Sequence, residues 1–362
     1  MKNKFYLKLM VLLLSISIIS CSDDDGDPRP TSISPMGDNG YFIINEGNFG
    51  SGDASLSYYN RDSAKVFNDV FSTYIGRPLG DQAQSMYIAD SIGFIIVQGS
   101  VKIEVININS MTSIATITGE DGLVSPRYFL KIDDDKAYVT DWGEGGIVGT
   151  VKIIDLHTYE ITNTVSTGVG ADKLVRRGDE VYVVNSGGYG TDNTIAVIDV
   201  AADEVVKKIE VGANPNSIQL DNNGDLWVSG AGIIEGYDDL YNAISSGYLA
   251  RIDADDEVDL MVEVEQSSGA ITKLLINASE DQLYYNYNGG VYSMSIDDTS
   301  LPSTPIFEGS FYGLGVDPVS GNVLAAEAPS FTAAGSAYVY STSGQEQTSY
   351  QVGIGPNGFY FK

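Results

Sequence analysis

The sequence has few of the residues that common enzyme sites need. Its 362 residues include one cysteine, Cys21, and one histidine, His157. A single cysteine excludes an intrachain disulfide, and one histidine in a predicted turn cannot complete the usual zinc sites or a Ser-His or Cys-His pair. No glycine-rich phosphate loop opens a helix. The sequence therefore predicts a binding protein rather than an enzyme, with no catalytic residues, metal site or cofactor.

Basic residues are also scarce. The chain carries 20 lysines and arginines against 49 aspartates and glutamates, a formal net charge of −29. A surface of this sign repels phosphate backbones, so nucleic-acid binding is excluded.

The N-terminus has the pattern of an export signal. A basic start is followed by an apolar run, Leu9–Ile19, that is too short to span a bilayer comfortably. The run ends in Ile18-Ile19-Ser20-Cys21, which resembles the lipobox cut by the lipoprotein signal peptidase. We expect a signal peptide over residues 1–20 and lipidation of Cys21, which gives stable attachment to a membrane.

Residues 21–39 form the expected linker between the lipid and the folded part. Asp23–Asp25 follow the cysteine directly, and Pro, Ser and Gly are common in the rest. The acidic run resembles the signal that sends Bacteroidetes lipoproteins to the outer face of the outer membrane; the alternative is a solvated linker alone. The expected location is the outer membrane, lipid-anchored and exposed on the cell surface.

A strand rich in Tyr and Val recurs along residues 40–362, and its starts are separated by 40 to 57 residues. Each copy is followed by two more strands and preceded by a shorter one, and four strands in such a repeat are typical of a propeller blade. The recurring strands are Tyr41–Ile44, Phe94–Val97, Ala137–Thr140, Val181–Val184, Leu226–Ser229, Leu283–Asn286 and Val323–Ala326. The prediction is an all-β, seven-bladed propeller of four-stranded antiparallel blades, closed by Pro356–Phe361 joining the N-terminal blade.

The loops on the two sides of this ring differ in composition. Those on the side called the bottom are short and acidic, as in Asp133–Asp135; calcium ligation there is conceivable, but a solvated turn fits better because none has the spacing of a calcium loop. Loops on the top combine aromatic rings with Gly, Asn or Ser, which suits a binding surface. The candidate ligand-binding residues are Arg127, Trp142, Asn185, Tyr189, Asn216, Tyr237, Tyr241, Tyr287 and Phe331.

Two segments and the repeated strands carry a family resemblance. Ile44–Phe49, Pro78–Met86 and the elements Val181–Asn185 and Ile195–Asp199 resemble the surface-lipoprotein propellers of Bacteroidetes with YVTN/YncE-like repeats. That family includes cobalamin-capturing lipoproteins of the BtuG type, which cap a TonB-dependent transporter. The resemblance implies a small-molecule nutrient as ligand, corrinoids first, and a TonB-dependent outer-membrane receptor as partner.

Three functions are compatible with the sequence. Nutrient capture predicts a concave, aromatic-lined top face. An adhesion or protein-interaction propeller predicts a flat face without a pocket. A lactonase-like metal-dependent hydrolase predicts three or four carboxylates and amides that converge on a metal in the channel.

Overall fold

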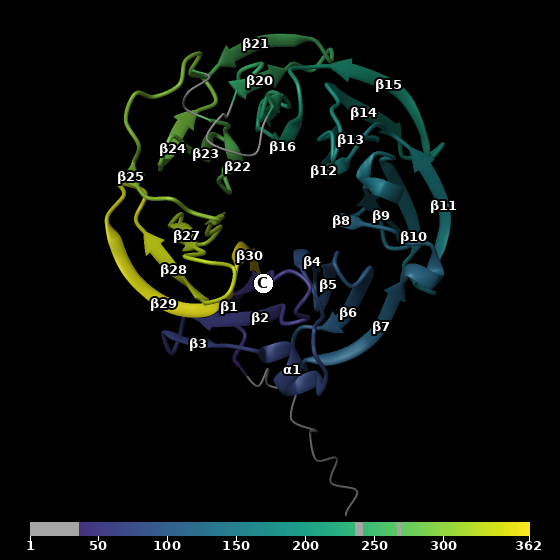
Figure 1. Ribbon diagram of the computed structural model, residues 1–362, viewed down its shortest axis with the longest axis vertical. Coiled ribbons are helices and arrows are strands. Elements are labelled where there is room, and N and C mark those ends of the chain that lie inside the picture. Colours follow the sequence, from purple (N-terminus) through teal and green to yellow (C-terminus); the bar gives the residue numbers. More distant parts are fainter. Residues whose placement is uncertain (1–35, 236–241, 266–268) are drawn as a thin grey trace, which may run out of the picture. The chain divides into compact units, whose positions relative to one another are not determined.

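The computed structural model describes residues 36–235, 242–265 and 269–362. Strands arranged around a central axis form a ring (Figure 1). Cys21, the signal peptide and most of the linker lie outside the described residues.

Five sheets of the ring have four strands each, all antiparallel. From the axis outward, the first three are β4 (Ala83–Ala89), β5 (Ile92–Val97), β6 (Lys102–Asn107) and β7 (Thr112–Thr118); β8 (Pro126–Lys131), β9 (Lys136–Asp141), β10 (Thr150–Asp155) and β11 (Ile161–Ser166); and β12 (Ala171–Arg177), β13 (Glu180–Asn185), β14 (Thr194–Asp199) and β15 (Glu204–Glu210). The other two are β16 (Pro215–Leu220), β17 (Leu226–Gly230), β20 (Tyr248–Ile252) and β21 (Val258–Glu263); and β22 (Thr272–Ile276), β23 (Gln282–Tyr287), β24 (Gly290–Ser295) and β25 (Phe307–Glu308).

The remaining ring strands form one eight-stranded sheet in the order β29-β28-β27-β26-β30-β1-β2-β3. Its members are β1 (Gly40–Asn45), β2 (Ser55–Asn60), β3 (Lys65–Phe67), β26 (Gly313–Val316), β27 (Val323–Glu327), β28 (Ala334–Tyr340), β29 (Glu346–Ile354) and β30 (Pro356–Phe361). The C-terminal strand β30 pairs antiparallel with β1, so the two ends of the described chain meet in this sheet.

The prediction of seven separate four-stranded blades is wrong. The structure has five separate blades, and β26 pairs with β30 in parallel at Leu314 and Gly358, which makes the other eight strands one sheet. Glycines allow this approach: a Cβ at Gly315 would lie 2.8 Å from the Cβ of Phe359. Counting repeats along a chain cannot show where neighbouring blades come close enough to pair.

Short elements occupy the connections. They are the helix α1 (Val70–Ile75), the 3-10 turns η1 (Gly119–Asp121) and η2 (Glu144–Gly146), and the strand pair β18 (Ile234–Glu235) and β19 (Asn242–Ala243). Within the described residues, no helix combines the length and the apolar character that a membrane span requires.

The core lies between the faces of adjacent sheets. Because both faces of a blade are covered, the middle of its second strand is largely apolar; Val181–Val184 of β13 are fully buried between Glu180 and Asn185. The outermost strands are polar instead: β15 has the sequence EVVKKIE and is mostly exposed. Charged edges of this kind discourage pairing with other chains.

Candidate functional site

The wall of the central channel consists of the strands nearest the axis, and several of them begin with an irregularity. The register shifts between Ala83 and Ser85 in β4, Pro126 and Phe129 in β8, and Ala171 and Leu174 in β12. Such bulges redirect side chains and are common beside functional sites. Here they carry the polar residues Gln84, Arg127, Tyr128, Asp172 and Lys173 into the channel wall.

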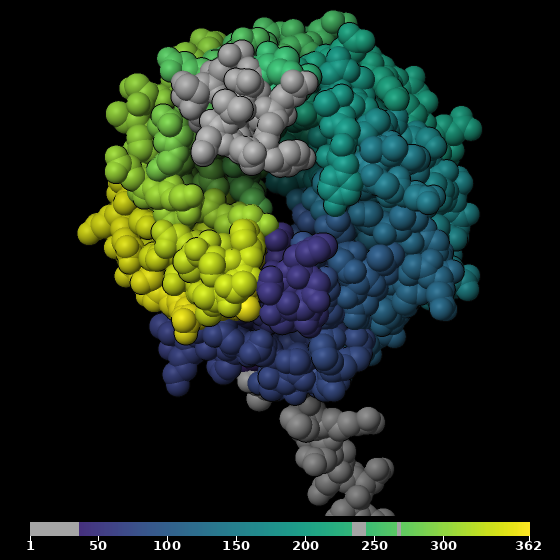
Figure 2. All heavy atoms as spheres, in the orientation of Figure 1, coloured from purple at the N-terminus to yellow at the C-terminus, as the bar shows by residue number. Residues whose placement is uncertain are grey.

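A cavity of about 710 Å³ opens at the mouth of this channel. Figure 2 shows a hollow near the centre of the face toward the viewer. The volume is within the range of small-molecule sites. Its lining includes aromatic, amide and charged side chains: Glu46, Phe49, Gln82, Gln84, Gln98, Arg127, Tyr128, Trp142, Asp172, Lys173, Tyr189, Asn216, Lys273 and Tyr312.

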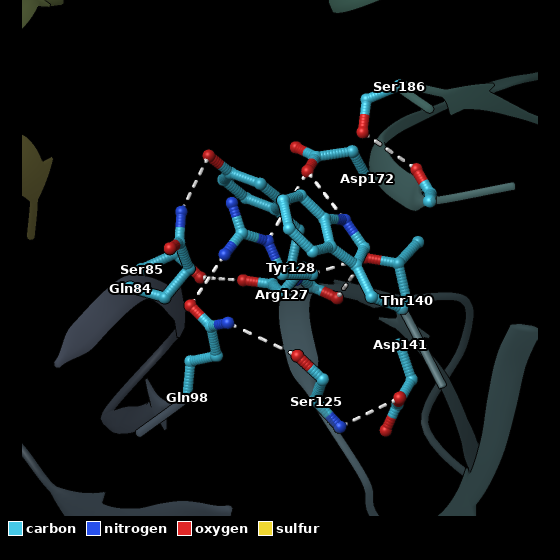
Figure 3. A network of polar contacts seen from close by, with 12 residues as sticks. Gln84, Ser85, Gln98, Ser125, Arg127, Tyr128, Thr140, Asp141, Asp172 and Ser186 are labelled. Carbon is cyan, nitrogen blue, oxygen red and sulfur yellow. Dashed lines mark hydrogen bonds and ion pairs between the residues drawn. The ribbon is translucent and has the colours of Figure 1, made fainter. Parts of the chain in front are cut away.

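Arg127 is held from three sides. Its guanidinium carbon lies 4.0 Å from the centre of the Trp142 ring, its Nε donates to Asp172 Oδ2 at 3.3 Å, and its Nη1 donates to Gln98 Oε1 at 2.6 Å. Trp142 Nε1 donates to the same Asp172 oxygen at 3.0 Å. Arg127 of β8 and Asp172 of β12 are thus held together with Gln98 and Trp142, which directly follow β5 and β9. Figure 3 shows the contacts of Arg127 with Gln98 and Asp172.

A further layer of hydrogen bonds supports this group. Gln98 Nε2 donates to Ser125 Oγ at 3.2 Å, and the backbone N–H of Ser125 donates to the buried carboxylate of Asp141 at 2.9 Å (Figure 3). The Ser85 hydroxyl donates to the Arg127 carbonyl at 2.6 Å, and Gln84 Nε2 lies 3.1 Å from the Tyr128 hydroxyl. Side chains supported in this way form a preorganised surface.

Glu46 accepts hydrogen bonds from two neighbouring side chains. The Tyr312 hydroxyl donates to its Oε2 at 2.5 Å, and Asn357 Nδ2 donates to its Oε1 at 2.6 Å. Burial, together with the neighbouring Glu46 charge, raises the pKa of Tyr312 far above its ordinary value. The phenol therefore stays protonated and continues to donate to the carboxylate.

Two lysines lie in the channel wall on different sheets. Lys173 Nζ donates to Ser217 Oγ at 2.9 Å, and Lys273 Nζ donates to the Asn357 carbonyl at 3.0 Å. Burial and then the Lys273 charge lower the pKa of Lys173 to about 8. Burial is also the main reason that the pKa of Lys273 falls, although Glu46 and Asp172 oppose the fall.

A smaller cavity of about 140 Å³ adjoins the first. The two share Gln84, Tyr128, Lys173 and Lys273 in their linings, and the smaller one also borders Asn357. The buried Oδ1 of Asn357 accepts no hydrogen bond from the described residues. Because both cavities are lined by Lys173 and Lys273, the two lysines lie at the junction between the large cavity and the small one.

Four of the sequence-predicted residues line the large cavity: Arg127, Trp142, Tyr189 and Asn216. Tyr189 is 78% exposed and meets Trp142 edge to face, with ring centres 5.6 Å apart. The Asn216 amide is already engaged, since it donates to the Ile271 carbonyl and accepts from Ser229.

The other predicted residues lie elsewhere. Asn185 is fully buried and donates to Thr194, outside the cavity lining. Tyr287 packs on Tyr292 and borders a neighbouring depression of about 180 Å³, which shares Thr272 with the large cavity. Phe331 packs edge to face on Tyr312, 5.0 Å between ring centres. Tyr237 and Tyr241 lie outside the described residues.

Sequence reasoning missed Glu46, Gln84, Gln98, Tyr128, Asp172, Lys173, Lys273 and Tyr312 as candidates. A signal for several of them exists: an alanine or proline followed by a polar residue opens five of the inner strands. These pairs are Ala83-Gln84, Pro126-Arg127, Ala171-Asp172, Pro215-Asn216 and Pro356-Asn357.

The described part of the chain contains no group of three or more His, Cys, Asp or Glu side chains placed to hold a metal ion. His157 is in an exposed turn, where its Nε2 lies 2.8 Å from Asp135 Oδ1. That hydrogen bond raises the pKa of His157.

Comparison with known proteins gives a family for the chain. It belongs to the family described as Domain of unknown function (DUF5074), which matches residues 39–362. No curated protein matches the sequence.

Solved structures of low sequence identity share the fold. A quinonprotein alcohol dehydrogenase-like protein from Bacteroides thetaiotaomicron VPI-5482 is 14% identical, with a TM-score of 0.66 over 89% of this chain and 78% of the other. A functionally unknown protein from Desulfotomaculum acetoxidans DSM 771 is 11% identical, with a TM-score of 0.64 over 89% and 98%. A protein from Lactobacillus plantarum is 13% identical, with a TM-score of 0.62 over 89% and 99%. These similarities establish the propeller fold alone, and they give no support for the YVTN/YncE-like or BtuG-type family in particular.

Proposed function

We propose that this DUF5074 propeller is a binding protein that captures a small molecule in the cavity at the mouth of its channel. The observation that carries the proposal is the fixed group of Arg127, Trp142 and Asp172 in the wall of a cavity of about 710 Å³. A concave site with aromatic walls and a few oriented polar groups is typical of ligand recognition. A flat adhesion surface needs no such cavity.

Two exposed rings favour a ligand with an apolar or planar part. Phe49 and Tyr189 both line the cavity, and each is 78% exposed. The Tyr189 ring rests against Gly146, where a Cβ would lie 2.3 Å from the ring. Rings that are exposed yet supported offer contact area at a low entropic cost.

The proposed setting is the cell surface. The lipobox-like Ile18–Cys21 and the acidic residues after it favour a lipid-anchored protein of the outer membrane. The resemblance of Ile44–Phe49 and Pro78–Met86 to the surface-lipoprotein propellers suggests a nutrient passed to a TonB-dependent receptor, and corrinoids are the first candidates. In the described part of the channel, no three His, Cys, Asp or Glu side chains are placed to hold a metal ion, so nothing there favours the lactonase-like alternative.

Calorimetry on the mature protein tests the capture of a small molecule. The panel contains corrinoids, haem, siderophores and oligosaccharides. Trp142→Ala and Tyr189→Ala should each weaken binding by roughly 1–3 kcal/mol, about ten- to a hundred-fold in Kd, because each removes an aromatic wall.

Tyr287→Ala is the matched control, because Tyr287 borders a different depression. The Tyr287→Ala variant should bind the panel ligand with the same Kd as the wild type. If no panel member binds more tightly than millimolar, capture of these ligands fails and the adhesion function gains support. If a ligand binds but neither cavity variant changes its Kd, the site is elsewhere.

A further inference from the structure

We propose that Lys173 and Lys273 form an anion-binding subsite at the base of the cavity, which takes a carboxylate or phosphate group of the captured molecule. This inference rests on the proposed function and adds the charge of the ligand. The charged side chains of the cavity lining are three cations and two carboxylates.

The carboxylates are already engaged by other donors. Asp172 accepts from Arg127 and Trp142, and Glu46 accepts from Tyr312 and Asn357. Among the described residues, Arg127 is therefore the one cavity cation that has an anionic contact.

The lysines differ from Arg127 in their partners. Across the described ranges, neither Lys173 nor Lys273 has a carboxylate oxygen within 4.0 Å, and each donates one hydrogen bond to a neutral oxygen. An ammonium group has three donors, so each lysine keeps N–H groups for a ligand. Half-buried charges without an anionic partner are unfavourable for the folded protein alone.

The backbone at Lys273 supports the same conclusion. Its φ of 55° lies in the left-handed region, which residues other than glycine seldom adopt. The register of β22 against β23 shifts around this residue, between Thr272 and Leu275. Register shifts of this kind redirect side chains and are common beside functional sites.

The two ammonium groups also act on each other. The charge of Lys273 lowers the pKa of Lys173, as expected for like charges in a poorly solvated place. A bound anion removes this repulsion.

The adjoining cavity of about 140 Å³ has room for a compact group, since a water molecule fills about 30 Å³ of liquid.

The test uses the only two tryptophans of the chain as reporters. In protein labelled with 5-fluorotryptophan, the 19F signal of Trp142 reports the cavity, whereas fully buried Trp227 reports the fold. Sulfate serves as the tetrahedral probe and acetate as the planar one. In the wild type, one or both should shift the Trp142 signal in a saturable manner and leave Trp227 in place.

Lys173→Met and Lys273→Met keep the aliphatic stem and remove the charge. Each should weaken anion binding at least about ten-fold, because one of two charge-assisted contacts is lost. Lys208→Met is the matched control: Lys208 is an exposed lysine on β15, distant from the cavity lining, and its loss should leave anion affinity unchanged. An unshifted Trp227 signal verifies that each variant is folded.

Sulfate affinity should also fall as the pH rises through about 8, where Lys173 loses its proton. The groups that act on this lysine are Lys273 and Asp172, and Arg127 and Glu46 act on Lys273. Sulfate remains a dianion throughout, so a change in affinity reports the protein. Affinity that is flat across this range contradicts the role of Lys173.

The two proposals fail in different ways. If a panel ligand binds and depends on Trp142, but both lysine variants bind it and the anions as the wild type does, the anion subsite is wrong and the capture site remains. If neither sulfate nor acetate moves the Trp142 signal at millimolar concentrations, the subsite is also wrong. If no panel ligand binds but sulfate does, and the lysine variants abolish it, the subsite is right and the panel lacked the ligand.

Discussion

At the scale of single residues, the cations of the cavity differ in whether a carboxylate lies beside them. Arg127 and Asp172 are mostly buried and satisfy each other, whereas Lys173 faces another cation. The carboxylate of Asp172 compensates the charge of Arg127, whereas among the described residues no carboxylate within 4.0 Å compensates the charge of Lys173. Residues that cost stability at the base of a cavity are the ones most directly explained by a ligand.

Replacing Arg127 with Gln should destabilise the protein by about 2–3 kcal/mol, because Asp172 keeps its charge and loses its ion partner. Urea unfolding measures the loss. Arg127→Gln combined with Asp172→Asn should recover part of it. Lys131→Gln is the control, since its partner Asp134 is 94% exposed and such pairs contribute little. Equal losses for Arg127→Gln and Lys131→Gln would contradict this account.

Lys173→Met should have the opposite effect on stability. The pKa of Lys173 is lowered from 10.5 to about 8 in the folded protein. Between these values the unfolded chain binds a proton that the folded chain does not, so stability rises with pH there. At pH 7 both states are charged and the folded protein bears the full cost. The variant should therefore unfold at a higher urea concentration than the wild type at pH 7, and a lower midpoint would count against the unfavourable charge.

The sequence could identify some of these residues and not others. Trp142 and Tyr189 could be identified because both are aromatic rings in the polar loops predicted for the top face. Asp172 and Lys173 lie within the sequence of a strand, where two polar residues are also typical of an exposed strand. The sequence does not show the bulge that turns them toward the channel axis. Asn185 was expected to face a ligand, but its amide turns inward to Thr194.

At the scale of elements, the junction of β26 and β30 distinguishes this ring from a set of separate blades. The strands touch through Leu314 and Gly358, and the absence of a side chain at Gly315 leaves space for Phe359. The sequence predicted β30 as an inner strand and its pairing with the strand at Tyr41, which the structure contains. The parallel contact between β26 and β30 depends on Gly315 and Gly358. No pattern in the sequence distinguishes these two glycines from the others.

Gly315→Ala should destabilise the protein by about 1–3 kcal/mol, because the new methyl group would lie 2.8 Å from the Cβ of Phe359 and the strands must move apart. Gly190→Ala is the control, since its added Cβ would meet nothing closer than 3.5 Å. Thermal unfolding compares the two. An unchanged Tm for Gly315→Ala would mean that the junction is loosely packed.

At the scale of the whole molecule, the repeat in the sequence was enough to predict an all-β propeller, because four strands per unit leave few other architectures. It was not enough to count separate sheets, which depends on pairing between units. The chain has a formal net charge of −29, whereas the cavity lining holds three cations and two carboxylates. This local excess of positive charge is in line with the proposed anion subsite.

The proposed location has its own test. Cys21→Ala should release the protein from the membrane fraction, because the acyl chains are its proposed anchor. Fractionation followed by protease treatment of intact cells measures attachment and surface exposure. A variant that still sediments with membranes would remove the lipid anchor from this account.

The cavity as the binding site is tested most directly by a crystal structure of the mature protein with the tightest ligand of the panel. We predict ligand density at the channel mouth, with a ring against Tyr189 or Phe49 and an anionic group within hydrogen-bond distance of Lys173 or Lys273. Well-defined ligand density elsewhere on the ring, with this cavity filled by water alone, would contradict it.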